Sequence, residues 1–149
     1  MEEIEASHSR LETLIRVAEA KDLRFVHHSW ARTLATEPYL RDAGVSVSIS
    51  AKSFERFLDE RLPEMVTIIS CNPEDPDQIF GYITGERGCI HFLYVKEYIR
   101  QEGIASDLIK RFSAKTYSYA SQTAKRLARK YKLQFNPFHL WGIFLDDSH

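Results

Sequence analysis

Residues 93–109 read Leu-Tyr-Val-Lys-Glu-Tyr-Ile-Arg-Gln-Glu-Gly-Ile-Ala-Ser-Asp-Leu-Ile. The stretch begins at the end of an apolar run typical of a strand, and behind Gly103 the apolar residues Ile104 and Leu108 recur at helical spacing. Free backbone N–H groups at a helix N-terminus, aided by the helix dipole, bind phosphate groups, and glycine lets the backbone approach them closely. The stretch therefore predicts a strand, a short turn and a helix whose N-terminus holds an anion such as pyrophosphate.

Three strands precede this helix in immediate succession. Residues 65–71 are rich in β-branched side chains, and the turn-forming residues 72–77 separate them from a second strand at 79–86. A second turn at 85–88 leads into the third strand, 89–95. We expect the three strands to pair antiparallel.

Shorter patterns predict the remaining elements, with Asp22 and Ser50 placed as helix N-caps. These elements are a strand at 14–18, a helix from 22, a long loop, a helix from 50 closed by Pro63, the helix from Gly103, a strand at 117–120 and a basic helix at 123–131. The order predicts an α/β (α+β) fold with a mixed, largely antiparallel central sheet and helices on both faces. Because no repeat or linker interrupts the chain, we expect one domain over 1–149.

Composition excludes several classes of protein. With 149 residues, 44% hydrophobic and 28% charged, the chain is typical of a soluble globular protein. Residues 1–5 are acidic, and neither a signal-peptide pattern nor a run of about 18 apolar residues occurs, so we expect a cytoplasmic location and no membrane contact. Cys71 and Cys89 lie in apolar runs without the spacing of a zinc site, which predicts reduced core residues. His27 and His28 diverge by about 100° on a helix, and we expect no metal.

Residues 100–105, Arg-Gln-Glu-Gly-Ile-Ala, resemble the Arg/Gln-x-x-Gly-x-Gly/Ala signature of the GNAT (GCN5-related N-acetyltransferase) superfamily. The flanking strand and helix and the order of elements extend the resemblance over nearly the whole chain. In that family this loop holds the pyrophosphate of acyl-CoA. The resemblance therefore implies acetyl-CoA or another acyl-CoA as co-substrate, held by Leu93, Tyr94, Val95, Arg100, Gln101, Glu102, Gly103, Ile104 and Ala105. The alternative is that Gly103 only permits a helix to begin.

A narrower resemblance concerns residues 22–30, 93–96 and 135–138, which look like parts of small GNAT-type proteins encoded by bacteriophages. It implies that the protein works in the cytoplasm of a host cell.

Acyl transfer to an amine requires a base for the amine and an acid for the departing thiolate. His91 interrupts an apolar strand, and strand alternation predicts that it shares a face with Leu93 and Val95. Some arylalkylamine acyltransferases of the GNAT class have a catalytic histidine at this offset, so the resemblance implies His91 as the base and Tyr131 as the acid. Alternatively, either side chain is a hydrogen-bonded core residue. The chain departs from the family at Ala124 and Gln134, where many members have asparagine and glycine.

The leading hypothesis is an N-acyltransferase that moves an acyl group from acyl-CoA to a primary amine by direct attack. The acceptor is a small molecule, a protein lysine or N-terminus, or a modified DNA base. The basic run 125–132 faces solvent, the CoA phosphates or a polyanion such as nucleic acid. The competing hypothesis is a non-catalytic module of the same fold that binds DNA or a host protein. We expect a monomer or a homodimer.

Overall fold

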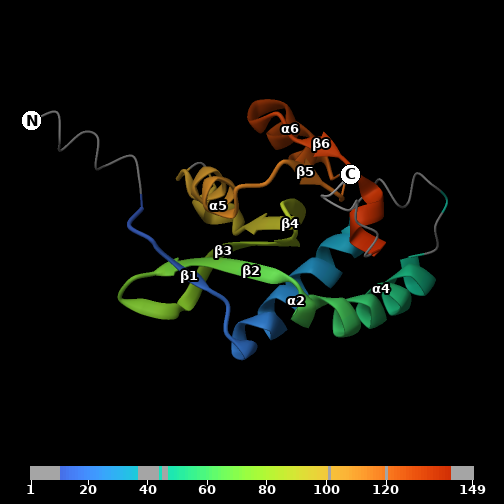
Figure 1. Cartoon of the computed structure of the whole chain (residues 1–149). Helices are drawn as coiled ribbons and strands as arrows, with labels where there is room; N and C mark the ends of the chain where they lie inside the picture. Colours follow the sequence, from blue (N-terminus) through green and yellow to red (C-terminus); the bar gives the residue numbers. More distant parts are fainter. Residues whose placement is uncertain (1–10, 37–43, 45–46, 101, 120, 142–149) are drawn as a thin grey trace, which may run out of the picture.

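A six-stranded sheet forms the centre of the computed structural model, which describes residues 11–36, 44, 47–100, 102–119 and 121–141. The strands lie in the order β1-β2-β3-β4-β5-β6 (Figure 1). Strands β1 to β4 pair antiparallel, whereas β5 is parallel to β4 and β6 is parallel to β5. The mixed, largely antiparallel sheet confirms the predicted fold class. The elements are β1 (Leu14–Val17), α2 (Ala20–Thr36), α4 (Val47–Arg61), η1 (Leu62–Glu64), β2 (Val66–Asn72), β3 (Asp75–Glu86), β4 (Cys89–Val95), η2 (Glu97–Ile99), α5 (Ile104–Phe112), β5 (Thr116–Tyr117), α6 (Gln122–Tyr131), β6 (Gln134–Phe135) and η3 (Pro137–Trp141).

Two hairpins set the register of the three long strands. The turn between β3 and β4 consists of Arg87 and Gly88, with φ of 50° and 73°, the conformation that two-residue hairpins favour. Between β2 and β3, Asn72 already pairs with Asp75. The predicted turn over 72–77 was therefore too long, because the exposed polar start of β3 has no apolar alternation to mark it as a strand.

Helices α2 and α4 cover one face of the sheet and are drawn beneath the sheet in Figure 1. Val26 and Trp30 of α2 and Leu58 of α4 are fully buried. They form a cluster with the sheet residues Tyr82 and Phe92, and Trp30 stacks on Phe92 with ring centroids 4.9 Å apart. We call this cluster the α2/α4 core.

Helix α5 covers the other face and buries Ile104 and Leu108 against Ile68 and Ile83 of the sheet. Leu127 of α6 packs against the same cluster, which we call the α5 core. Helices thus lie on both faces, as the sequence predicted.

The N-cap prediction at Asp22 is wrong. Helix α2 begins at Ala20, so Asp22 lies in its first turn. Its carboxylate accepts the N–H of Glu19 at 2.7 Å and binds Arg16 at 2.6 Å. Asp22 thus satisfies a free backbone donor from inside the helix, as the third residue of a capping box does.

The N-cap prediction at Ser50 is also wrong, because α4 begins three residues earlier, at Val47. Serine is a weak predictor of a helix end, since burial of a helix face overrides local propensity. In α4 that buried face includes Leu58, with Phe54 partly buried beside it.

The last strands are short. β5 spans Thr116–Tyr117 rather than the predicted 117–120, and β6, at Gln134–Phe135, was not predicted. A strand of two residues carries no alternation that a sequence pattern can show. By contrast, Gly103 is the N-cap of α5, in agreement with the predicted helix start, and α6 begins within one residue of its predicted position.

Candidate functional site

Strands β4 and β5 separate after two paired residues. Cys89 pairs with Thr116 and Ile90 with Tyr117, and a last backbone bond of 3.0 Å joins the Ser118 N–H to the Ile90 carbonyl. Beyond this bond β4 continues alone along β3. The separation opens a wedge between the two parallel strands, with Ser118 at its closed end.

The edge of β4 that faces the wedge carries the backbone groups of Leu93 and Val95. Lys96 donates its N–H to Phe80 of β3, so strand alternation directs the backbone groups of Leu93 and Val95 away from β3. Arg100 donates its Nε–H to the Val95 carbonyl at 3.1 Å, which places the guanidinium at the end of this edge.

A groove of about 530 Å³ runs along this edge and past the start of α5. Seven of the nine predicted cofactor residues line it, namely Leu93, Tyr94, Val95, Arg100, Gly103, Ile104 and Ala105. Among the described residues, Glu102 does not line the groove, and its carboxylate accepts the N–H of Leu11 at 3.0 Å. Gln101 lies outside the described residues.

The N-terminus of α5 forms one end of this groove. Gly103 has a φ of 80°, in the left-handed region that favours glycine. The first intrahelical bond runs from Asp107 to the Gly103 carbonyl, so it leaves the N–H groups of Ile104, Ala105 and Ser106 without partners within the helix. These donors, with the helix dipole, suit an anion.

Two cations that sequence reasoning did not single out line the same groove. Arg126 and Lys130 of α6 line it, whereas Lys125 and Arg129 of the same helix do not, although all four side chains are exposed. Together with Arg100, they give the groove three cations. The i, i+4 spacing of Arg126 and Lys130 places them on one helix face, but Lys125 and Arg129 have the same spacing, so the sequence alone does not single out Arg126 and Lys130.

The predicted base, His91, lies in a β-bulge. Thr84 pairs with Phe92 and the next residue, Gly85, pairs with Ile90, so His91 is the additional residue on β4. Bulges of this kind redirect a side chain and occur often next to active sites.

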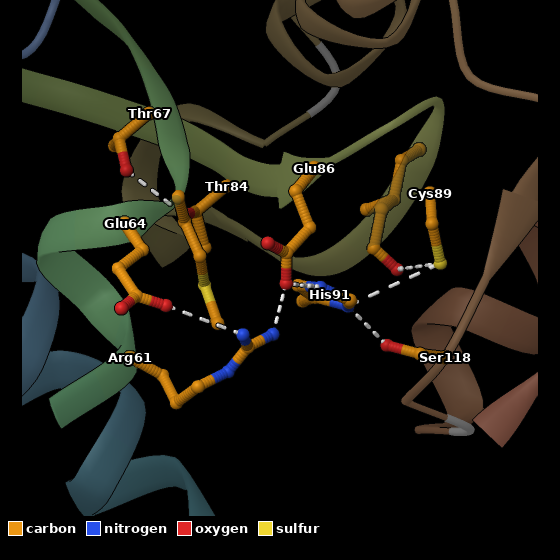
Figure 2. A network of polar contacts seen from close by, with 10 residues as sticks. Arg61, Glu64, Thr67, Thr84, Glu86, Cys89, His91 and Ser118 are labelled. Carbon is orange, nitrogen blue, oxygen red and sulfur yellow. Dashed lines mark hydrogen bonds and ion pairs between the residues drawn. The ribbon is translucent and has the colours of Figure 1, made fainter. Parts of the chain in front are cut away.

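The bulge turns His91 toward α4. Its Nε2 lies 3.0 Å from Oε1 of Glu86, and the same carboxylate binds Arg61 at the end of α4 (Figure 2). Leu93 and Val95 pack instead against the α5 core. The prediction that His91 shares a face with Leu93 and Val95 is therefore wrong, because one additional residue reverses the alternation.

The His91 ring is buried and hydrogen-bonded on both sides. The residue is 1% exposed, and Nδ1 lies 2.5 Å from the Ser118 hydroxyl. Burial lowers the pKa of His91 below its ordinary value, by more than the hydrogen bond to Glu86 raises it. The imidazole is therefore neutral at pH 7, the form that accepts a proton.

A small cavity of about 30 Å³ lies beside the groove. His91, Tyr117 and Tyr119 line it, and it shares Leu93 and Leu127 with the groove. By volume it holds roughly two water molecules.

The predicted acid, Tyr131, ends α6 and packs beside the α5 core. Its hydroxyl is hydrogen-bonded to the hydroxyl of Ser106, which lines the groove. Tyr131 itself is not among the lining residues that the structure describes. Tyr131 therefore lies outside the groove, next to Ser106, which lines it.

The described residues contain no group of three or more histidine, cysteine or acidic side chains that could hold a metal ion. In the same part of the chain, none of the helices combines the length and the apolar character needed to span a bilayer.

Comparison with known proteins gives matches in structure alone. No family model matches the chain, and a search of curated proteins finds no similar sequence. The apo-form of YjaB from Escherichia coli is 16% identical, with a TM-score of 0.56 over 82% of this chain and 80% of that one. A GCN5-related N-acetyltransferase from Ralstonia eutropha is 17% identical, with a TM-score of 0.54 over 80% and 91%. A GCN5-related N-acetyltransferase from Rhodopseudomonas palustris is 16% identical, with a TM-score of 0.53 over 82% and 81%. The chain therefore has the fold of the GCN5-related N-acetyltransferases.

Proposed function

We propose that the protein is an acyl-CoA-dependent N-acyltransferase, which transfers an acetyl or related acyl group to a primary amine by direct attack. The observation that carries this proposal is the groove, in which the N-terminus of α5, the open edge of β4 and three cations line one continuous surface. No other feature of the described structure combines these elements.

The groove suits the parts of acyl-CoA in sequence. The free N–H groups of the first turn of α5 and the Arg100 guanidinium match the pyrophosphate. Arg126 and Lys130 supply further positive charge for phosphate groups. The backbone groups of Leu93 and Val95 match the amides of an extended pantetheine arm, as an edge strand pairs with an added strand. The thioester would then lie toward the closed end of the wedge.

His91 as base and Tyr131 as acid belong to this proposal. His91 is neutral, the form that accepts a proton, and it lines a small cavity that shares Leu93 and Leu127 with the groove. Tyr131 ends α6 beside the groove, where the Ser106 hydroxyl holds its own hydroxyl, and as the acid it would protonate the departing thiolate. Neither role requires a covalent intermediate on the protein.

The experiment has two stages. Acetyl-CoA is first added to the purified protein in a thermal-denaturation assay, where a ligand at 100 times its dissociation constant adds about 2.7 kcal/mol of stability. A panel of primary amines, peptides and nucleosides with amino groups is then incubated with acetyl-CoA and screened by mass spectrometry. The expected result is stabilisation followed by an acyl-CoA-dependent mass increase of one acceptor. Absence of stabilisation at millimolar acetyl-CoA would contradict the proposal.

A second candidate is a CoA-binding module without catalysis. It is favoured by the His91 ring, both of whose nitrogens already have hydrogen-bond partners within the protein. Stabilisation by acetyl-CoA with no transfer to any acceptor in the panel would support this candidate. The exposed cations Lys125, Arg129 and Lys132 of the same helix end are the surface that a DNA-binding assay would then test. The resemblance to phage proteins and the cytoplasmic location stay predictions, as does the single domain over 1–149.

A further inference from the structure

The network around Glu86 fixes the protonation of His91. A carboxylate can only accept hydrogen bonds, and Glu86 receives one from Arg61 as well as facing Nε2 of His91 at 3.0 Å. The proton of the neutral imidazole therefore lies on Nε2. The lone pair is then on Nδ1, which faces the Ser118 hydroxyl at 2.5 Å, so Ser118 is the donor of that bond (Figure 2).

This arrangement has a consequence for proton transfer. Because the lone pair of His91 is directed at Ser118, a proton that His91 accepts arrives most directly through the Ser118 hydroxyl. Ser118 lies at the closed end of the wedge, where its N–H makes the last bond to Ile90. Its neighbours in the chain, Tyr117 and Tyr119, line the small cavity that adjoins the groove.

We propose that Ser118, His91 and Glu86 form a proton relay for the acceptor amine. The inference rests on the proposed acyl transfer. As the amine nitrogen bonds to the thioester carbonyl, it releases one proton to the Ser118 oxygen, and Ser118 passes its own hydroxyl proton to Nδ1 of His91. The imidazolium that results is stabilised by Glu86, and the C–S bond breaks with the proton for the thiolate coming from the Tyr131 side. Ser118 keeps one hydrogen throughout and forms no bond to carbon.

In this relay Ser118 is a catalytic residue and Glu86 is a positioning residue. Arg61 holds Glu86 in place from α4, and both side chains are largely buried, at 19% and 13% exposed. The other groups around His91 are Cys89 on its own strand and, further away, Arg61 and His139 of η3, both of which lower the pKa of His91. Glu86 raises that pKa, so loss of its charge lowers it further.

The structure provides a matched control for Glu86. Glu64 binds the same Arg61, at 3.4 Å, but is exposed on the other side of the guanidinium. Glu64→Gln and Glu86→Gln remove the same charge from the same arginine, and only Glu86 contacts His91. The two variants therefore separate the loss of a charge from the loss of contact with the imidazole.

The first measurement needs no acceptor and no variant. In the ¹⁵N NMR spectrum of the uniformly labelled protein at pH 7, the relay predicts that His91 is neutral with its hydrogen on Nε2. A hydrogen on Nδ1 would overturn the proposal, because His91 would then have no lone pair for Ser118. The NMR result does not depend on whether acetyl-CoA binds. Binding of acetyl-CoA is a separate measurement, and it tests the proposed function.

The second measurement is kcat against pH with the acceptor that the screen identifies. Glu86→Gln is expected to lower kcat roughly 10²-fold and to move the acid limb of the profile to lower pH, whereas Glu64→Gln leaves both unchanged. Ser118→Ala is expected to lower kcat to a similar extent at unchanged affinity for acetyl-CoA, and Ser118→Thr, which keeps the hydroxyl, to restore much of it. Binding of acetyl-CoA with kcat and acid limb unaltered in Glu86→Gln and Ser118→Ala would refute the relay. A mass increase of one acyl group on Ser118 would do the same, because the hydroxyl would then be a nucleophile.

Discussion

The hydroxyl of Tyr131, the last residue of α6, is hydrogen-bonded to the hydroxyl of Ser106 in the first turn of α5. The bond joins the two helices that flank the groove, and it lies at the end where the free N–H groups of α5 are found. Tyr131 is thus either the proton donor for the thiolate or a clamp between two helices. Mutation of Tyr131 lowers kcat if it is the proton donor and lowers the free energy of unfolding if it is the clamp.

If Tyr131 supplies the proton, Tyr131→Phe lowers kcat by roughly 10² to 10⁴-fold and leaves the affinity for acetyl-CoA within a few-fold of the parent. Ser106→Ala keeps the Tyr131 hydroxyl and should lower kcat less than Tyr131→Phe does. Steady-state kinetics and calorimetric binding of acetyl-CoA provide the two readouts. Tyr98→Phe, at a tyrosine that is 71% exposed, is the control. A variant that loses about 1 kcal/mol of stability while kcat is retained would assign Tyr131 to the clamp.

The two groove-facing cations of α6 should bind acyl-CoA through its phosphates. Arg126→Gln together with Lys130→Gln is expected to weaken acetyl-CoA binding by about a hundredfold, because each of the two lost contacts to an ionised partner is worth about 1.5 kcal/mol, or about tenfold. The matched control on the same helix, Lys125→Gln together with Arg129→Gln, removes the same charge at positions outside the groove and should change affinity little. Titration calorimetry at two salt concentrations distinguishes the pairs. Equal effects of the two double variants would show that only net charge matters.

The buried ion pair at the start of α2 should contribute to stability. Asp22 is 4% exposed and binds both Arg16 and the Glu19 N–H, so Asp22→Ala is expected to lower the free energy of unfolding by about 2 to 3 kcal/mol. Asp77→Ala breaks a comparable but exposed contact with Lys21 and should leave stability nearly unchanged. Chemical denaturation monitored by circular dichroism gives both values. Similar losses in the two variants would contradict the role given to burial.

The same ion pair predicts a pH dependence. Arg16 holds the pKa of Asp22 below its ordinary value, so the stabilising contribution is present at neutral pH and is lost as pH falls below the ordinary pKa of an aspartate, about 4. In Asp22→Ala the free energy of unfolding should therefore fall less steeply between pH 5 and pH 3 than in the parent. Parallel curves would show that the pair is not formed in solution.

His91 predicts a second dependence at higher pH. Because burial lowers its pKa in the folded protein, the unfolded chain binds the proton more readily, and stability falls as pH drops below about 6.5, the value of an unperturbed histidine. His91→Gln should remove this part of the slope between pH 6.5 and pH 5. If the slope persists in His91→Gln, another group titrates in this range.

Much of the sheet and the α5 end of the groove could be predicted from the sequence. Strands β2 and β4 and the second part of β3, from Ile79, are apolar, and Gly103 followed by Ile104 and Leu108 marks the start of α5. The position of His91 could not be predicted, because the bulge is a property of two strands paired together. A Cβ at Gly85 would lie 2.0 Å from the Cys89 carbonyl oxygen, so this glycine permits the bulge. A single glycine in a strand pattern does not by itself predict a bulge.

Contacts that depend on how the strands and helices pack were equally hidden. Glu86 and Ser118 reach His91 only because β3 and β5 lie on either side of β4. Arg126 and Lys130 line the groove and Lys125 and Arg129 do not, because only one face of α6 meets the groove. Sequence periodicity places residues on a common helix face, but tertiary packing decides which face meets the ligand.

The most direct test of the central claim is titration calorimetry of acetyl-CoA against the protein and two variants of Ala105. Gly103 is less suitable for this purpose, because its φ of 80° would strain any substituted side chain. Ala105 lines the groove in the first turn of α5, where an acidic residue favours the helix, so Ala105→Asp should fold and yet repel the pyrophosphate. The account predicts saturable one-to-one binding to the parent and to Ala105→Ser, and none to Ala105→Asp. Binding of equal affinity to Ala105→Asp, or no binding to the parent, would contradict it.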